Sequence, residues 1–166
     1  DPNEPLAHTA VGHALVLLRR YTEARQRYDE ALSLNPNDTV IRGLRAILNG
    51  YTGRYEEALS DIEEALRRDP YAADWLWDHR GTIMMAYGRP ADAIASYEKM
   101  KFVPPWGLAH QAVSYVELGK LQEAGAIYRR LRDGYANWLG GGWVSDPSYL
   151  FDQFEHQTDI DRFVAA

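Results

Sequence analysis

The sequence has 166 residues, of which 46% are hydrophobic and 25% charged, a balance typical of one folded domain or a short array of repeats. Its 24 acidic and 18 basic side chains give a formal net charge of −6, which argues against a protein that binds the nucleic-acid backbone. It contains no cysteine, which excludes disulfides and thiol catalysis, and no apolar run approaches the roughly 18 residues of a membrane span.

One stretch near the N-terminus occurs twice. RRYTEARQRYDEALSLNP starts at Arg19 and GRYEEALSDIEEALRRDP starts at Gly53, 34 residues later, with eight of 18 aligned residues identical. Further copies start at 88 and 119, so four alanines recur at spacings of 34, 35 and 31 residues: Ala24, Ala58, Ala93 and Ala124. Apolar residues four and seven positions after each alanine predict the buried face of a helix.

Residues that end helices separate the copies. Prolines close the first three units, because proline does not continue a helix: Pro36, Pro70 and Pro105. Glycine, which adopts a left-handed conformation at little cost, precedes the last three copies, at Gly53, Gly88 and Gly119. The first copy has Arg19 in that place. Each unit is therefore predicted to be a helix–turn–helix pair of about 34 residues.

The pattern resembles the tetratricopeptide repeat, in which W-x2-L-G-x2-Y is followed by A-x3-F, A and P over about 34 residues. We expect four units, near 5–38, 39–73, 74–104 and 105–138, and then a glycine-rich loop with capping helices in 139–166. The resemblance implies an all-α, right-handed superhelical solenoid. Stacking explains the repetition, because a single helix pair cannot bury its own apolar faces.

The first helix of the second unit departs from the repeat pattern. Arg42, Arg45 and Asn49 occupy positions that are nominally buried. Its apolar face is better described by other residues, so we expect the helix to be rotated: Ile41, Leu44, Ile47, Leu48 and Tyr51.

Ligands of the resembled family bind against the first helices of the units, on the concave side. The residues at the matching positions are His13, Leu17, Ile47, Tyr51, Trp75, Asp78, His79, Thr82, Trp106, His110 and Val113. Their neighbours at further matching positions are Thr9, Val16, Leu44, Gly50, Met85, Ala109 and Glu117. We therefore expect a protein–protein interaction module that binds a partner peptide or helix in this groove. For each residue the alternative is packing between helices, and Trp75 and Trp106 are either exposed anchors or buried at repeat junctions.

Other kinds of site find little support in the sequence. Some members of the resembled family hold the C-terminal carboxylate of heat-shock chaperones with Lys and Asn, whereas Thr9 and His13 stand there, so we do not predict chaperone-tail binding. His13, His79 and His110 lie on three different units without an i, i+4 partner, which argues against a metal site. No nucleophile, phosphate-binding or zinc-protease motif is present, so neither an enzyme nor a cofactor is expected.

Charged residues cluster on two predicted second helices. The basic cluster contains Arg19, Arg20, Arg25 and Arg27, and the acidic one Glu56, Glu57, Asp61, Glu63 and Glu64. Solvated outer faces with weak ion pairs explain both, and a phosphate site at the arginines is the alternative. An RNA-binding helical array, which the period also permits, conflicts with the acidic net charge.

The repeat pattern ends after Leu131. Gly140–Gly142 predict a loop, Asp146–Pro147 start a helix through about Glu155, and a last helix is expected over 160–166. Apolar side chains of these helices are expected to cover the exposed end of the fourth unit: Tyr149, Leu150, Phe154, Ile160 and Phe163. The alternative is a loop that senses a small molecule, formed by Tyr135, Trp138, Trp143 and Tyr149.

A looser resemblance covers residues 72–124. The Asp74-Trp75-x-Trp77 start, the Pro104-Pro105-Trp106 junction and the later Asp146-Pro147 are similar to the C-terminal tetratricopeptide region of some bacterial class III adenylate cyclases and winged-helix regulators. This resemblance implies a regulatory part of a larger, cytoplasmic bacterial protein. The absence of an initial Met also leads us to expect a fragment of a longer chain, and homo-oligomers are possible in such arrays.

Overall fold

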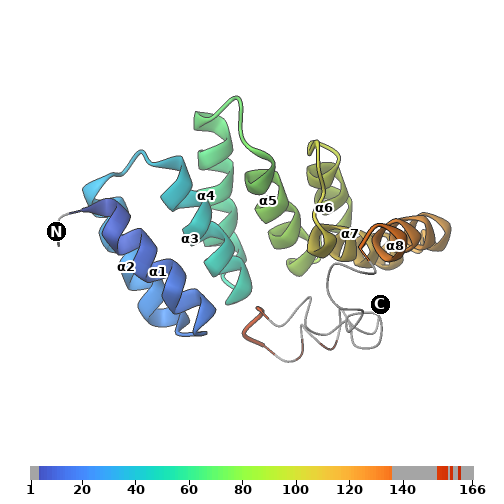
Figure 1. Ribbon diagram of the computed structural model, residues 1–166, viewed down its shortest axis with the longest axis horizontal. Coiled ribbons are helices and arrows are strands. Elements are labelled where there is room, and N and C mark those ends of the chain that lie inside the picture. Colours follow the sequence, from blue (N-terminus) through green and yellow to red (C-terminus); the bar gives the residue numbers. More distant parts are fainter. Residues whose placement is uncertain (1–3, 136–152, 157, 159–160, 162–166) are drawn as a thin grey trace.

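The computed structural model describes residues 4–135, 153–156, 158 and 161, and the statements below concern these residues. They form eight α-helices and no strand: α1 (Pro5–Leu17), α2 (Tyr21–Leu34), α3 (Thr39–Tyr51), α4 (Tyr55–Arg68), α5 (Asp74–Ala86), α6 (Pro90–Tyr97), α7 (Pro105–Glu117) and α8 (Leu121–Tyr135). Figure 1 shows the helices following one another as antiparallel pairs along the molecule. The expected all-α helical array is confirmed. None of these helices is long and apolar enough to cross a membrane.

The array curves because its two layers pack differently. The first helices of successive pairs contact one another, α1 with α3, α3 with α5 and α5 with α7. Among the described residues, the second helices of successive pairs contact each other less. An array whose first helices are closer together bends around them, so α1, α3, α5 and α7 form its inner layer.

The turn inside each helix pair requires a left-handed residue. Gly53, Gly88 and Gly119 have φ angles of 73°, 75° and 71°. Arg19 takes the same place in the first pair with a φ of 57°, the one positive φ of a non-glycine residue in the described chain. A left-handed conformation costs a residue with a side chain about 1–2 kcal/mol, so this arginine is held there against its preference.

Small residues allow the two helices of a pair to approach closely. The side chains of Ala24, Ala58 and Ala93 are fully buried. Glycine has the same function on the facing helix, since a Cβ atom at Gly81 would lie 2.5 Å from the ring of Tyr97. A methyl group does not fit at that distance, so Gly81 is required by packing.

The irregular second unit is explained by charged groups that bridge helices. The guanidinium of Arg45 on α3 donates to Asp61 on α4 and, over 2.7 Å, to Asp29 on α2. Arg42 donates to the same Asp61 carboxylate over 3.1 Å. The buried face of the helix contains Ile41, Ile47 and Leu48, so the polar residues at nominally buried positions have partners between the helices.

Candidate partner-binding groove

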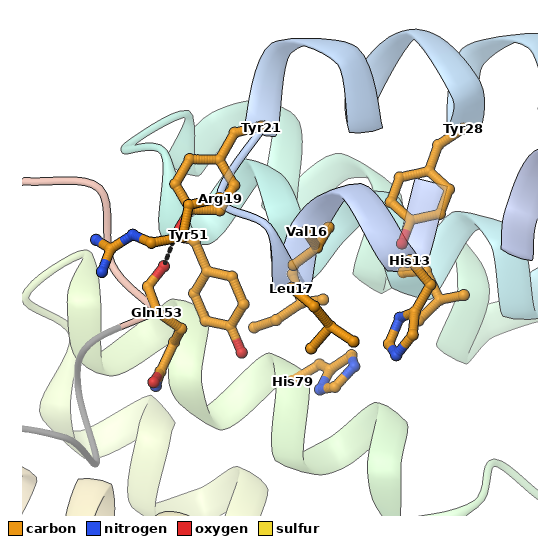
Figure 2. A pocket seen from close by; sticks show the side chains of 11 residues that line it. His13, Val16, Leu17, Arg19, Tyr21, Tyr28, Tyr51, His79 and Gln153 are labelled. Carbon is orange, nitrogen blue, oxygen red and sulfur yellow. Dashed lines mark hydrogen bonds between the residues drawn. The ribbon is translucent and has the colours of Figure 1, made fainter. Parts of the chain in front are cut away.

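A cavity of about 380 Å³ opens on the inner layer, over the first three helix pairs. We call it the groove cavity. It is lined by His13, Val16, Leu17, Arg19, Tyr21, Tyr28, Leu44, Ile47, Tyr51, His79 and Gln153. Figure 2 shows the side chains of Leu17, Tyr51 and His79 converging from three helices. Most of the lining is aliphatic or aromatic, and this composition favours an apolar ligand oriented by a few polar groups.

Helical spacing places the lining residues on common faces. His13, Val16 and Leu17 follow an i, i+3, i+4 pattern on α1, and Leu44, Ile47 and Tyr51 follow an i, i+3, i+7 pattern on α3. The Leu17 side chain is 75% exposed although it is aliphatic. The groove cavity thus presents apolar surface that the first helices do not cover themselves.

The structure brings together five of the residues that the sequence assigned to the groove: His13, Leu17, Ile47, Tyr51 and His79. Four others lie buried in the core around α5 and α7 and do not line the cavity: Asp78, Thr82, His110 and Val113. They face neighbouring helices, where α5 packs against α6 and α7.

A buried polar network occupies that tight contact. The Thr82 hydroxyl donates to the Asp78 carbonyl oxygen over 3.0 Å and lies 3.1 Å from Nδ1 of His110. It also lies 3.4 Å from the hydroxyl of Tyr97. Burial, and secondarily the nearby Asp78 carboxylate, raise the pKa of Tyr97 well above its ordinary value. These groups hold α5, α6 and α7 together, which is a structural role.

The two tryptophans that were expected in the groove also lie outside the groove cavity. The indole Nε1 of Trp106 donates to Oδ2 of Asp78 over 3.0 Å, and the residue is partly exposed. Trp75 is half-buried against Gly43 and meets the ring of His79 edge-on at 5.3 Å. Trp75 therefore packs against His79, which lines the groove cavity, without lining the cavity itself.

A short piece of the C-terminal region lies beside the groove cavity. We call residues 153–156 the tail segment; it is drawn in red in Figure 1, near the ends of α1 and α3. The hydroxyl of Tyr21 donates to the backbone carbonyl of Gln153 over 3.0 Å, the dashed line in Figure 2. Phe154 is fully buried, and its ring meets that of Tyr51 edge-on at 5.4 Å.

The tail segment corrects one expectation and extends another. A helix was predicted from Asp146 through about Glu155, but residues 153–155 form a turn and bends. Phe154 was expected to cover the exposed end of the fourth unit; it is buried in a core cluster with Val113 and Leu131 of that unit, and it also contacts Tyr51 of the second unit and bonds through its carbonyl to Arg19 of the first. The alternative site at Trp138, Trp143 and Tyr149 and the helix over 160–166 fall outside the described residues, Asp161 excepted, and so does the side chain of Tyr135.

Arg19 and Tyr21 are groove residues that the sequence pattern of the family did not select. Their signal was nonetheless visible, since Arg19 stands where the other units have glycine. The remaining arginines of the basic cluster have carboxylate partners: Arg20 pairs with Glu23, Arg27 with Glu30, and Arg25 with Glu57 on α4. Ion pairs therefore account for these three side chains.

Comparisons with known proteins give a consistent result. Family models described as tetratricopeptide repeats match residues 5–38 and 44–104.

Individual proteins with such repeats are also similar to this chain. A small glutamine-rich tetratricopeptide repeat-containing protein 2 from Mycosarcoma maydis is 28% identical over 96 residues, 58% of this chain and 27% of that protein. The Hsp70-Hsp90 organizing protein of Triticum aestivum is 30% identical over 133 residues, 79% of this chain and 22% of that protein. Tetratricopeptide repeat protein 33 of Mus musculus is 27% identical over 124 residues, 74% of this chain and 46% of that protein. The chain thus spans less than half the length of each of these relatives.

Proposed function

Because the chain belongs to the tetratricopeptide repeat family, and its relatives carry such repeats, we propose that it is a protein–protein interaction module whose groove cavity binds a peptide or helix of a partner protein. The observation that carries this proposal is the open apolar wall formed by Leu17, Ile47 and Tyr51 on the inner layer. Burial of aliphatic and aromatic surface would supply the affinity, and the polar groups at the rim would fix the register.

The chemistry of the groove cavity favours an apolar partner over a charged one. None of the three lysines, Lys99, Lys101 and Lys120, lines it. The Thr9 hydroxyl donates to the carbonyl of Pro5 in its own helix over 2.7 Å. With no lysine in the groove cavity and the Thr9 hydroxyl bonded within its own helix, these positions do not make a carboxylate clamp. We therefore do not extend chaperone binding to this chain, although one relative is named as an organizer of Hsp70 and Hsp90.

We further propose a regulatory role within a larger protein, as the resemblance to the repeat regions of adenylate cyclases and winged-helix regulators implies. Binding of a partner segment in the groove cavity would then be the event that the larger protein senses. The length of the relatives, of which this chain spans 22% to 46% in the three compared above, agrees with such an arrangement.

Two neighbouring leucines provide a matched test. Leu17 lines the groove cavity and Leu18 does not, while their side chains are 75% and 65% exposed. Peptides selected from a displayed random library on the immobilised chain would be titrated against Leu17→Lys and Leu18→Lys. We expect Leu17→Lys to weaken binding at least tenfold and Leu18→Lys to leave it unchanged. Equal binding to both variants would place the site outside the groove cavity.

A further inference from the structure

The tail segment lies beside the groove cavity and makes there the kinds of contact that a peptide ligand would make. We infer that the groove binds a peptide with an aromatic anchor, that Arg19, Tyr21 and Tyr51 recognise its backbone, and that residues 153–156 compete with it as an internal ligand. This inference rests on the proposed function and specifies its partner. The part of the groove next to Tyr51 is therefore covered in the resting chain until a stronger segment displaces the tail segment, while the groove cavity stays open.

The first support comes from three hydrogen bonds to the backbone of the tail segment. Nη2 of Arg19 donates to the carbonyl of Phe154 over 3.0 Å, and the Tyr21 hydroxyl donates to the carbonyl of Gln153 over 3.0 Å. The amide of Glu155 donates to the carbonyl of Tyr51 over 2.9 Å. Backbone groups are common to all peptides, so these contacts fix the direction and register of a ligand without selecting its sequence.

The position of Phe154 determines which peptide sequences the groove prefers. Phe154 is fully buried in the same core cluster as Met84, Met85 and Val113, although no helix of the array supplies it. Its ring meets Tyr51 edge-on at 5.4 Å and lies 6.5 Å from His110. Aromatic contacts of this geometry add to the burial of apolar area, so an aromatic side chain is the ligand that this position favours.

The strained conformation of Arg19 is an independent observation. The same turn is made by glycine in the other three pairs, and Arg19 adopts it with a φ of 57°. Strain in a backbone persists where the surrounding structure holds the residue in place, and strained residues are concentrated at functional sites. Here the guanidinium of Arg19 donates to the tail segment and also lines the groove cavity. We therefore assign it the function of binding the backbone of whichever segment lies in the groove.

The tail segment can compete with a partner peptide because it belongs to the same chain as the groove. A segment on the same chain acts at an effective concentration of the order of millimolar, so even weak contacts keep it bound. A partner peptide then binds with its intrinsic affinity reduced by the fraction of chains whose groove is open. The adjoining groove cavity, lined by Leu17, Ile47 and His79, stays accessible and offers the partner a first contact beside the tail segment.

The test uses the full chain and a labelled peptide of residues 149–158, YLFDQFEHQT, with binding followed by fluorescence anisotropy. We expect the Phe154→Ala chain to bind the peptide at least tenfold more tightly than wild type, because its own tail segment no longer competes. Phe102→Ala is the control, since Phe102 is exposed and does not line the groove cavity, and it should bind like wild type. A peptide with alanine in place of its Phe154 should not bind to any of the chains.

Arg19→Gly keeps the inference testable if Phe154→Ala does not fold. Glycine relieves the positive φ, so the variant should fold at least as well as wild type, yet it loses the donor to the Phe154 carbonyl. We expect the Glu155 amide, protected from hydrogen exchange in wild type, to exchange at least tenfold faster in Arg19→Gly. The buried Ile62 amide should exchange as before.

Three outcomes would overturn the inference. They are equal peptide affinity for wild type and Phe154→Ala, an unprotected Glu155 amide in the wild-type chain, and a wild-type dimer in light scattering that Phe154→Ala converts to a monomer. The last outcome would assign the tail segment to the groove of a second copy. The proposed function is judged separately, because loss of library peptides in Leu17→Lys supports groove binding whatever the tail segment does.

Discussion

The carboxylate of Asp61 on α4 accepts two hydrogen bonds from the guanidinium of Arg45 on α3, over 2.7 Å to Oδ2 and 2.8 Å to Oδ1. Asp61 is buried and also accepts from Arg42, so one carboxylate joins two arginines of the neighbouring helix. The hydrogen bonds and the charge of Asp61 raise the pKa of Arg45 above its ordinary value. This contact replaces apolar packing in the second unit.

Removal of the Asp61 charge should destabilise the array. We expect Asp61→Asn to lower the free energy of unfolding by about 1–3 kcal/mol, because both arginines lose their charged acceptor in a partly buried site. Glu23→Gln is the control, since Glu23 pairs with Arg20 at the surface, and it should change the free energy of unfolding far less than Asp61→Asn does. Urea unfolding measures both, and an effect of Asp61→Asn no larger than the control would contradict the structural role.

Alanine for glycine should have opposite effects at two helical positions. At Gly81 an added Cβ would lie 2.5 Å from the Tyr97 ring, so we expect Gly81→Ala to cost about 1–3 kcal/mol. At Gly125 on α8 the nearest atom is the end of the Arg129 side chain at 3.6 Å, and alanine should stabilise the helix by up to about 1 kcal/mol. Thermal melting of the two variants would show shifts of opposite sign. Shifts of the same sign would contradict the close packing at Gly81.

The recurrence of alanines at similar spacings along the chain predicts tight helix crossings. Ala93 is fully buried on α6, and Ala91 on the same helix is exposed. Ala93→Leu should therefore destabilise the protein by about 1–3 kcal/mol through overpacking, whereas Ala91→Leu should be close to neutral. Chemical denaturation compares them directly, and a neutral result for Ala93→Leu would mean that the crossing has room for a larger side chain.

Ionisation of Tyr97 should weaken the fold at alkaline pH. Its pKa is raised in the folded state, so its contribution to stability is fully present below the ordinary tyrosine pKa of about 10 and declines as pH rises above that value. Above about pH 10, Tyr97→Phe should therefore reduce the loss of stability by up to about 1.4 kcal/mol per pH unit. Tyr71→Phe is the control, because Tyr71 is 93% exposed, and it should leave the pH profile unchanged. Identical profiles for all three proteins between pH 9 and 12 would exclude Tyr97 as a source of the effect.

Much of the fold was predictable because it is local. Prolines and glycines at fixed spacings mark the ends of helices, and the recurring alanines mark where two helices of a pair meet, so the all-α array follows from short-range patterns around residues such as Gly88 and Ala93. The resemblance to the tetratricopeptide repeat, read at its ligand-binding positions, assigned His13, Leu17 and Ile47 to the groove, and these residues line the groove cavity.

Long-range contacts decided the rest. The pattern treats all first helices alike, so it could not tell that Thr82 and His110 would be buried between α5 and α7 while Leu17 stays open. It also could not place Phe154, which lies 135 positions from Arg19 in the sequence and one hydrogen bond from it in space. Periodicity reports which face of a helix is apolar, whereas the segment that covers that face is selected by the free energy of the whole folded chain. The sequence by itself thus determined the repeats and their inner layer, and the tertiary structure alone decided which part of that layer is open and which part the tail segment closes.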